Sequence, residues 1–207
     1  GCIACRCTYL NDRKDGTFES WYETGNKQEK HTYKDGVKEG QCEDWHENGP
    51  LSLRYTIRNG NTDGLSESWY EDGQKWKAIN YKNGQYDGLY ESWHSNGNRR
   101  SRYHCKNDEI DGAFEDWHPN GNPWKKACYK DGQYDGVLEE WSLDGKKRSR
   151  IHYLSGLKHG LCETWHPTGA LSWKCTYKEG KENGMWERWD EDGNHSLEHW
   201  QDGQPVD

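Results

Sequence analysis

Aromatic and polar positions alternate along this chain in a pattern that repeats every 24 residues. One tryptophan marks each period, with no insertion or deletion between them, at Trp21, Trp45, Trp69, Trp93, Trp117, Trp141, Trp165 and Trp189. A glutamate stands two residues before each tryptophan, at Glu19, Glu43, Glu67, Glu91, Glu115, Glu139, Glu163 and Glu187. A fixed period of this length indicates a repeat architecture in which each unit is one supersecondary element.

Each period contains two alternating segments separated by turns. In the first complete period, residues 17–22 alternate around Trp21, residues 24–26 form a turn, and residues 27–33 run to a second turn at Asp35 and Gly36. Asn-Gly and Asp-Gly pairs, as at Asn48-Gly49, favour turns because these residues tolerate positive φ. Alternation between such turns is typical of β-hairpins, and no stretch has an uninterrupted helical period.

We therefore predict an all-β fold, an elongated, solenoid-like single antiparallel sheet of about eight β-hairpin repeats. Hairpins that advance about 10 Å each would make a ribbon about 75 to 80 Å long and about 20 Å wide. One array would cover residues 1–207, with 1–15 as the second half of a partial repeat and full units at 16–39, 40–63, 64–87, 88–111, 112–135, 136–159, 160–183 and 184–207. Gly203 is one position out of phase, which indicates a one-residue deletion in the last unit.

Strand alternation places Thr17, Glu19 and Trp21 on one face of the first strand. On the second strand a tyrosine column recurs, with Ile57 and Cys105 as replacements, at Tyr9, Tyr33, Tyr81, Tyr129, Tyr153 and Tyr177. We expect this column to pack against the tryptophan column and the two together to form the core.

Composition supports a thin aromatic core. Only 30% of the residues are hydrophobic and 31% are charged, yet the chain has 13 Trp and 13 Tyr, which disordered chains lack. The net charge of −8 disfavours nucleic acid or membrane as the main partner. No run of 18 apolar residues and no signal-peptide pattern occurs, so we expect a soluble intracellular protein.

The repeated frame is Y-x-x-G-x-x-x-G-x-x-E-x-W-x-x-x-G, seen at Tyr81, Gly84, Gly88, Glu91, Trp93 and Gly97. It resembles MORN repeats, specifically their Trp-containing variant class, over nearly the whole chain. It is similar to arrays of bacterial antitoxin-like proteins and of giant DNA viruses of amoebae. The resemblance implies an open hairpin-repeat fold that serves as a scaffold, a membrane-associated module or a dimerisation element, and, if the chain is viral, a place in the host cytoplasm or the virion. Asp108 departs from the frame at a glycine position.

The repeat spacing argues against reactive or metal sites. Successive glutamates would lie about 10 Å apart, too far for paired carboxylate chemistry, so we assign them a structural role as acceptors for neighbouring hydroxyl, N–H or basic groups. Four histidines follow the tryptophans, at His46, His94, His118 and His166, and one period separates them too widely to share a zinc ion. We therefore predict no catalytic, cofactor or metal site and no enzyme activity.

Cysteine placement favours reduced thiols. Cys42 and Cys162 lie five repeats apart and Cys7 and Cys175 seven, beyond the reach of a disulfide. Cys2, Cys5 and Cys7 cluster near the first residue, a weak metal signal without further ligands.

The best candidate binding surface is a basic row on the second strands, at Lys30, Arg54, Arg102, Lys126, Arg150 and Lys174. Trp76 and Trp124 stand two positions before this phase, and we expect them on the same face, as a basic stripe interleaved with aromatic rings. The alternative is a solvated face neutralised across the strands by Asp44, Asp116 and Glu140.

The leading functional hypothesis is a non-enzymatic protein–protein interaction or structural scaffold module that presents an extended repeat surface. Open strand edges add the expectation of homo-oligomers. A competing hypothesis is an aromatic-rich module that binds a carbohydrate or a choline-type ligand. Nucleic-acid or lipid binding through the basic row ranks third.

Overall fold

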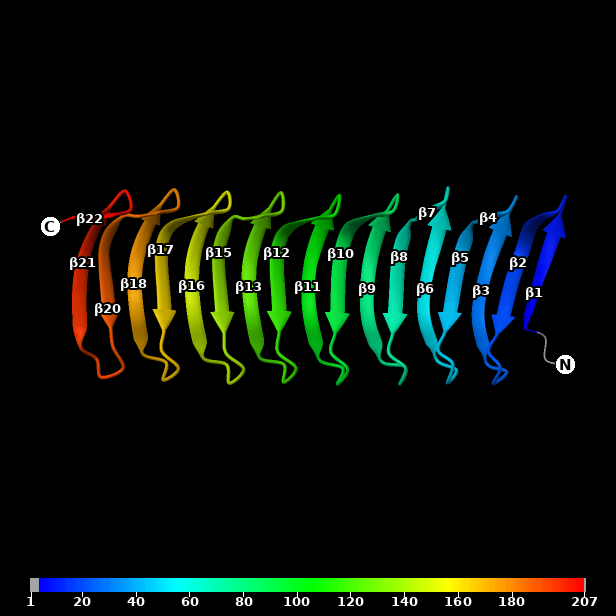
Figure 1. Cartoon of the computed structure of the whole chain (residues 1–207), viewed down its shortest axis with the longest axis horizontal. Helices are drawn as coiled ribbons and strands as arrows, with labels where there is room; N and C mark the ends of the chain where they lie inside the picture. Colours follow the sequence, from blue (N-terminus) through cyan, green and yellow to red (C-terminus); the bar gives the residue numbers. More distant parts are fainter. Residues whose placement is uncertain (1–3, 207) are drawn as a thin grey trace. The chain divides into compact units, whose positions relative to one another are not determined.

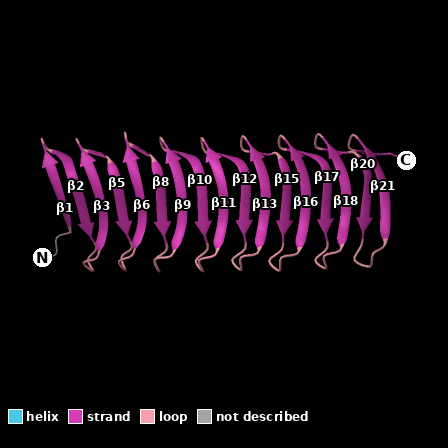
Figure 2. Cartoon of the chain, turned by 180° about the vertical axis from the view of Figure 1, so that it is seen from behind, coloured by secondary structure: helices cyan, strands magenta, loops and turns pink. Residues whose placement is uncertain are grey.

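Every regular element of the protein is a β-strand in the part that the computed structural model describes, residues 4–206. Figure 2 shows strands and connecting loops alone. No helix within these residues is long and apolar enough to cross a membrane. The strands fall into two compact units, unit 1 with residues 1–98 and 105–108, and unit 2 with residues 99–104 and 109–207. The predicted all-β fold is confirmed.

Unit 1 is an open antiparallel sheet whose strands pair in chain order. Its strands are β1 (Cys5–Leu10), β2 (Arg13–Trp21), β3 (Lys27–Lys34), β4 (Val37–Lys38), β5 (Gly40–Trp45), β6 (Leu51–Arg58), β7 (Asn61–Thr62), β8 (Gly64–Trp69), β9 (Lys75–Lys82) and β10 (Gln85–Trp93). Strand β11 (Arg99–Lys106) contributes residues to both units.

Unit 2 is built in the same way, with antiparallel neighbours in chain order. Its strands are β12 (Glu109–Trp117), β13 (Pro123–Lys130), β14 (Gln133–Tyr134), β15 (Gly136–Trp141), β16 (Lys147–Leu154), β17 (Leu157–Trp165), β18 (Leu171–Lys178), β19 (Lys181–Glu182), β20 (Gly184–Trp189), β21 (His195–Gln201) and β22 (Gln204–Val206). Figure 1 shows successive long strands running in alternating directions, as the predicted succession of hairpins requires.

Two kinds of turn join the strands. The turn at Asp35-Gly36 has positive φ at both residues, 50° and 84°, which is the conformation that matches the twist of a two-residue hairpin. The turn at Asn48-Gly49 is longer, and only its glycine has positive φ. Asp108, the departure from the frame, adopts φ of 69°, and its carboxylate accepts the Tyr86 N–H at 2.8 Å. An aspartate therefore replaces the glycine there without a change of turn.

A β-bulge lies in six of the tryptophan hairpins, where the strand after the turn carries one extra residue. Ser68 pairs with Lys77 and Trp69 with Lys75, so Trp76 has no partner in the register. The last hairpin, β20–β21, pairs without a bulge. The predicted one-residue deletion in the last unit therefore removes the bulged position.

The two faces of each sheet differ in chemistry. We name the face that carries Glu19 and Trp21 the Trp face, and the opposite face, with Phe18 and Tyr33, the Tyr face. Glu19 pairs with Lys30, whereas Gly16 pairs with Tyr33, so Tyr33 lies on the face opposite Trp21.

The core lies on the Tyr face, and the predicted packing of the tyrosine column against the tryptophan column is wrong. The apolar residues buried most deeply all occupy this face, at Cys42, Ile79, Cys105, Ala127, Leu138, Cys162, Cys175 and Tyr177. Tyr33 packs edge-on against Phe18, with ring centroids 6.2 Å apart. In unit 2, Phe114 stacks on Tyr103 at 5.3 Å and contacts Tyr129 at 5.6 Å. The tryptophan column is a second, more exposed layer on the other face.

Candidate functional site

The Trp face is an ordered lattice of carboxylates, cations and indole rings. The Lys27 ammonium contacts Glu19 at 3.0 Å, Lys75 contacts Glu67 at 2.6 Å and Lys147 contacts Glu139 at 2.7 Å. Hydrogen bonds from Arg6 and Lys27 lower the pKa of the Glu19 carboxyl below its usual range. In these hairpins the glutamate carboxylate is the partner of a lysine on the neighbouring strand, and the structural role of the column stays a prediction.

Each of several cations also lies over the tryptophan of a neighbouring repeat. The Lys27 ammonium is 5.2 Å from the ring centroid of Trp45, and the Lys147 ammonium is 5.6 Å from that of Trp165. Such cation–π contacts contribute about 0.5–1 kcal/mol at exposed sites. The cations thereby connect successive hairpins through the indoles, so the tryptophan column stabilises the array without forming a closed core.

The basic row lies on this same Trp face. Arg54 contacts Glu43 at 3.0 Å, and Lys126 contacts Glu115 at 3.2 Å across the strands. Their side chains remain 45% and 48% exposed, so about half of each cation faces solvent. The glutamates, rather than the predicted Asp44, Asp116 and Glu140, are the cross-strand partners of the row.

Trp76 and Trp124 do not join the basic row, and their predicted place on its face is wrong. Each is the bulged residue of its hairpin, so the alternation that we extrapolated shifts by one residue there. The Trp76 ring packs on Tyr70 with centroids 5.9 Å apart, and the Trp124 ring packs on His118 at the same distance. The structure thus brings the basic row together with the Glu and Trp columns but separates it from these two rings.

The histidine or tyrosine that follows several of the tryptophans links one hairpin to the next. His46 Nε2 lies 2.9 Å from the Trp69 carbonyl oxygen, and His166 Nε2 lies 2.7 Å from that of Trp189. The Tyr22 hydroxyl donates to the Trp45 carbonyl in the same way, at 2.8 Å. A donor of the right length explains why both His and Tyr occur at this position. The sequence showed the recurrence of these histidines but gave no sign of their acceptor.

A second series of hydrogen bonds joins the short turns. The Asp15 carboxylate accepts the N–H of Asp35, and the Asp63 carboxylate accepts the N–H of Asn83, both at 3.2 Å. These acidic residues precede the glycine that begins each repeat frame, and sequence reasoning missed their role. A constant separation of 20 residues between the acidic residue and the N–H that it caps was the available signal.

The cysteines are free thiols in the described part of the chain, and Cys2 lies outside it. No group of three or more His, Cys, Asp or Glu side chains in residues 4–206 is placed to hold a metal ion. Cys162 and Cys175, which we did not pair, are direct cross-strand partners and almost fully buried. The contact with the Cys162 sulfur, together with burial, raises the pKa of the Cys175 thiol.

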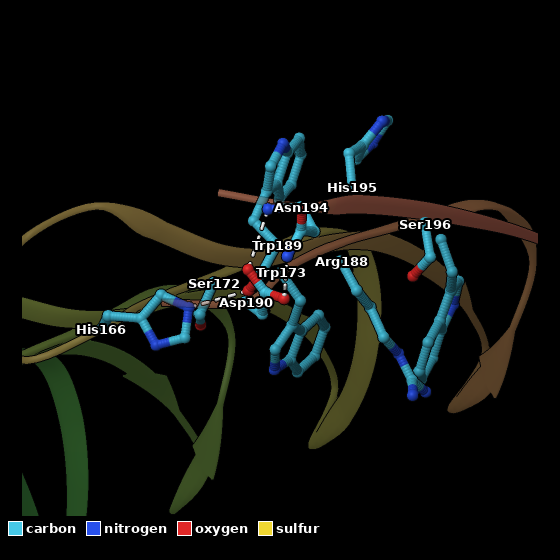
Figure 3. A pocket seen from close by; sticks show the side chains of 10 residues that line it. His166, Ser172, Trp173, Arg188, Trp189, Asp190, Asn194, His195 and Ser196 are labelled. Atoms are coloured by element: carbon cyan, nitrogen blue, oxygen red, sulfur yellow. Dashed lines mark hydrogen bonds between the residues drawn. The ribbon is translucent and has the colours of Figure 1, made fainter. Parts of the chain in front are cut away.

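An open cleft of about 670 Å³ lies beside the last two tryptophan hairpins of unit 2. His166, Ser172, Trp173, Trp186, Arg188 and Ser196 are among the residues that line it. Figure 3 shows Trp173 and Arg188 on one side of the ribbon and Trp189 and His195 on the other. Residues of both faces therefore line the cleft, although neither the basic row nor the glutamate column contributes to it.

Comparison with protein families agrees with this geometry. The model of the MORN repeat variant matches residues 14–35, 62–83 and 110–131. These three segments are similar to MORN repeats. The three matches begin two periods apart, and each MORN segment ends in a short turn of the Asp35-Gly36 type. A comparison with curated proteins found none that matches the chain. The predicted family resemblance is thus confirmed for three of the hairpins.

Removal of one carboxylate from the Trp face should cost little stability. Glu67→Ala leaves the Lys75 ammonium without its partner at 2.6 Å, and we expect a loss of about 0.5–1 kcal/mol because the pair is only partly buried. A thermal melt should therefore show a drop of a few degrees. Glu71→Ala, at an exposed turn position, serves as the control. Identical melting curves for both variants would contradict the structural role of the glutamates.

Proposed function

We propose that this chain is a non-enzymatic interaction or scaffold module whose Trp face binds a protein partner. The observation that carries the proposal is the repeated, half-exposed row of cations beside the glutamates on that face. Arg150 and Lys174 remain 42% and 43% exposed while each faces a carboxylate at 3.8 and 3.7 Å. Groups that are already held in place lose little side-chain entropy when a partner binds.

The lattice favours a protein partner over a polyanion. Five cations of the row pair with a glutamate across the strands, at Lys30, Arg54, Lys126, Arg150 and Lys174. The local field is therefore mixed, and the whole chain carries −8. Mixed charges of this kind suit a complementary protein surface, where alternating signs set register and specificity. MORN repeats generally mediate protein or membrane interactions, which agrees with this function.

A capture experiment with paired variants tests the proposal. The triple variant Lys126→Gln, Arg150→Gln, Lys174→Gln removes the unit 2 part of the row. Lys130→Gln, Lys178→Gln, Lys181→Gln removes the same charge at exposed positions near the short turns. Partners captured from the native host would be identified by mass spectrometry. We expect a protein that the wild type and the turn variant retain and the row variant loses. Equal capture by all three would refute a role for the row.

We also propose self-association through sheet edges. Strand β1 pairs with β2 on one side, and most of its residues are exposed. An exposed strand edge can accept a strand from a second copy. Light scattering during size-exclusion chromatography should show a mass that rises with concentration. A constant monomer mass at high concentration would exclude this contact.

The site of action that we propose is intracellular. Seven cysteines of the described residues are free thiols, and reducing compartments preserve such thiols. Rapid alkylation after lysis of the native source should modify them all under denaturing conditions. Recovery of the native protein with oxidised cysteines would count against this location.

A further inference from the structure

We propose that the cleft beside the last two tryptophan hairpins of unit 2 is a binding site for a neutral saccharide. Its volume of about 670 Å³ falls within the roughly 300–1,000 Å³ that is usual for small-molecule sites. It combines an aromatic wall with short polar side chains, the two features that pyranose recognition requires. The cations of the basic row do not line this site.

The cleft exists because a bulged position is occupied by a small residue. Trp76, Trp124 and Ser172 occupy equivalent positions, two periods apart. In the first two hairpins the bulged indole covers Tyr70 or His118 at 5.9 Å. The Ser172 hydroxyl instead lies 2.7 Å from Thr164 Oγ1, which leaves the space beside His166 open.

The next hairpin enlarges the same space. Arg188 pairs with Ser196 and Trp189 with His195, so no bulged residue is present to project over the cleft. The opening is thus a specific feature of these two hairpins and not a property of every repeat.

Trp173 and Trp186 form the aromatic wall, and Trp200 continues their stack without lining the cleft itself. Trp186 lies between Trp173 and Trp200, with ring centroids 5.4 and 5.3 Å away and interplanar angles of 14° and 34°. A stack of this kind is rigid and offers flat apolar surface, on which the C–H face of a pyranose ring can pack. The Trp186 Nε1–H is buried and has no hydrogen-bond partner within residues 4–206.

The rim carries fixed donors and acceptors of both signs. Asp190 Oδ1 accepts the Asn194 N–H at 2.8 Å and its Oδ2 accepts the Asn194 amide at 2.7 Å, and these hydrogen bonds lower the pKa of Asp190. The Arg188 guanidinium lies 5.4 Å from the Trp186 ring centroid and stays half exposed. One anion and one cation beside Ser196 suit hydroxyl groups, which both donate and accept.

Charge distinguishes this ligand from two others. A quaternary ammonium would need an aromatic cage free of positive charge, but Arg188 already lies over the central indole. A polyanionic saccharide would approach a chain of net charge −8 with Asp190 at the rim. A neutral saccharide meets neither repulsion.

Calorimetric titration with a panel of neutral oligosaccharides tests the site, using oligomers of glucose, galactose, mannose and N-acetylglucosamine. Choline and an oligouronate are the charged comparisons. We expect one neutral oligomer to bind with a millimolar or tighter dissociation constant, and Arg188→Gln to weaken it several-fold. Ser172→Trp should weaken binding at least about tenfold, because it restores the indole that Trp124 supplies in its own hairpin.

The matched control is Ser52→Trp, which adds an indole at the equivalent bulged position of β5–β6 in unit 1. This variant should bind like the wild type. No binding by any neutral oligomer, equal binding by Ser172→Trp, or tighter binding of choline or uronate would each overturn the proposal. None of these results bears on protein capture by the Trp face, so the two proposals fail separately.

Discussion

Above pH 10 the stability of both units is expected to fall steeply. Burial raises the pKa of Tyr55 and Tyr81 in unit 1 and of Tyr129 and Tyr177 in unit 2 well above the ordinary value of 10. The neutral phenols are therefore favoured in the folded state, whereas the unfolded chain ionises near pH 10. Their stabilising contribution is complete below pH 10 and is lost as the pH rises toward the folded-state pKa. Each such tyrosine contributes a slope of at most about 1.4 kcal/mol per pH unit.

Urea unfolding at neutral pH, at pH 9 and at several values above pH 10 measures this slope. The midpoint should hold steady between the first two conditions and then decrease, and tyrosinate absorbance of the folded protein should lag behind that of the denatured chain. Tyr177→Phe keeps the ring, which is 9% exposed, and removes one ionisable group. The free energy of unfolding of this variant should fall less steeply with pH, because one tyrosine no longer contributes to the slope. A midpoint that does not move above pH 10 would show that these phenols are not buried in solution.

The strands and turns could be predicted from the sequence because they depend on local pattern. The alternation around Trp21 and the turn at Asp35-Gly36 appear in the structure where the repeat places them. Local pattern does not give the register across a hairpin, which depends on turn length and on the bulge. The face of Tyr33 follows from its pairing with Gly16, and this pairing could not be read from either strand alone. The core was therefore assigned to the wrong pair of columns.

The same limit explains the errors at the candidate sites. Trp76 is itself the bulged residue of its hairpin and so does not lie with the basic row, and the sequence of its own strand does not indicate the bulge. Cys162 and Cys175 lie half a period apart and meet only because their strands pair in one register. The distance between repeats, by contrast, depends on strand spacing alone. For that reason the histidines could be interpreted as structural before the carbonyl that His46 contacts was known.

Leu138→Ala should destabilise unit 2 more than any removal of a group from the Trp face. Leu138 is 6% exposed and pairs with Ile151 on the Tyr face. Truncation of a buried leucine costs about 2–5 kcal/mol, and we expect about 2–3 kcal/mol because a single-layer sheet relaxes around the cavity. That loss corresponds to a melting temperature lower by roughly 5–10 °C.

Two neighbours in the same hairpin provide matched comparisons. Leu143→Ala makes the same substitution at a turn position that is 57% exposed, and its melting curve should coincide with that of the wild type. Glu139→Ala removes the partner of Lys147 from the Trp face and should cost about 1 kcal/mol at most. A core on the Tyr face therefore predicts that the loss of stability is largest for Leu138→Ala, smaller for Glu139→Ala and smallest for Leu143→Ala. If Glu139→Ala lowered the melting temperature more than Leu138→Ala, the ion pairs of the Trp face, and not the core on the Tyr face, would be the principal source of stability.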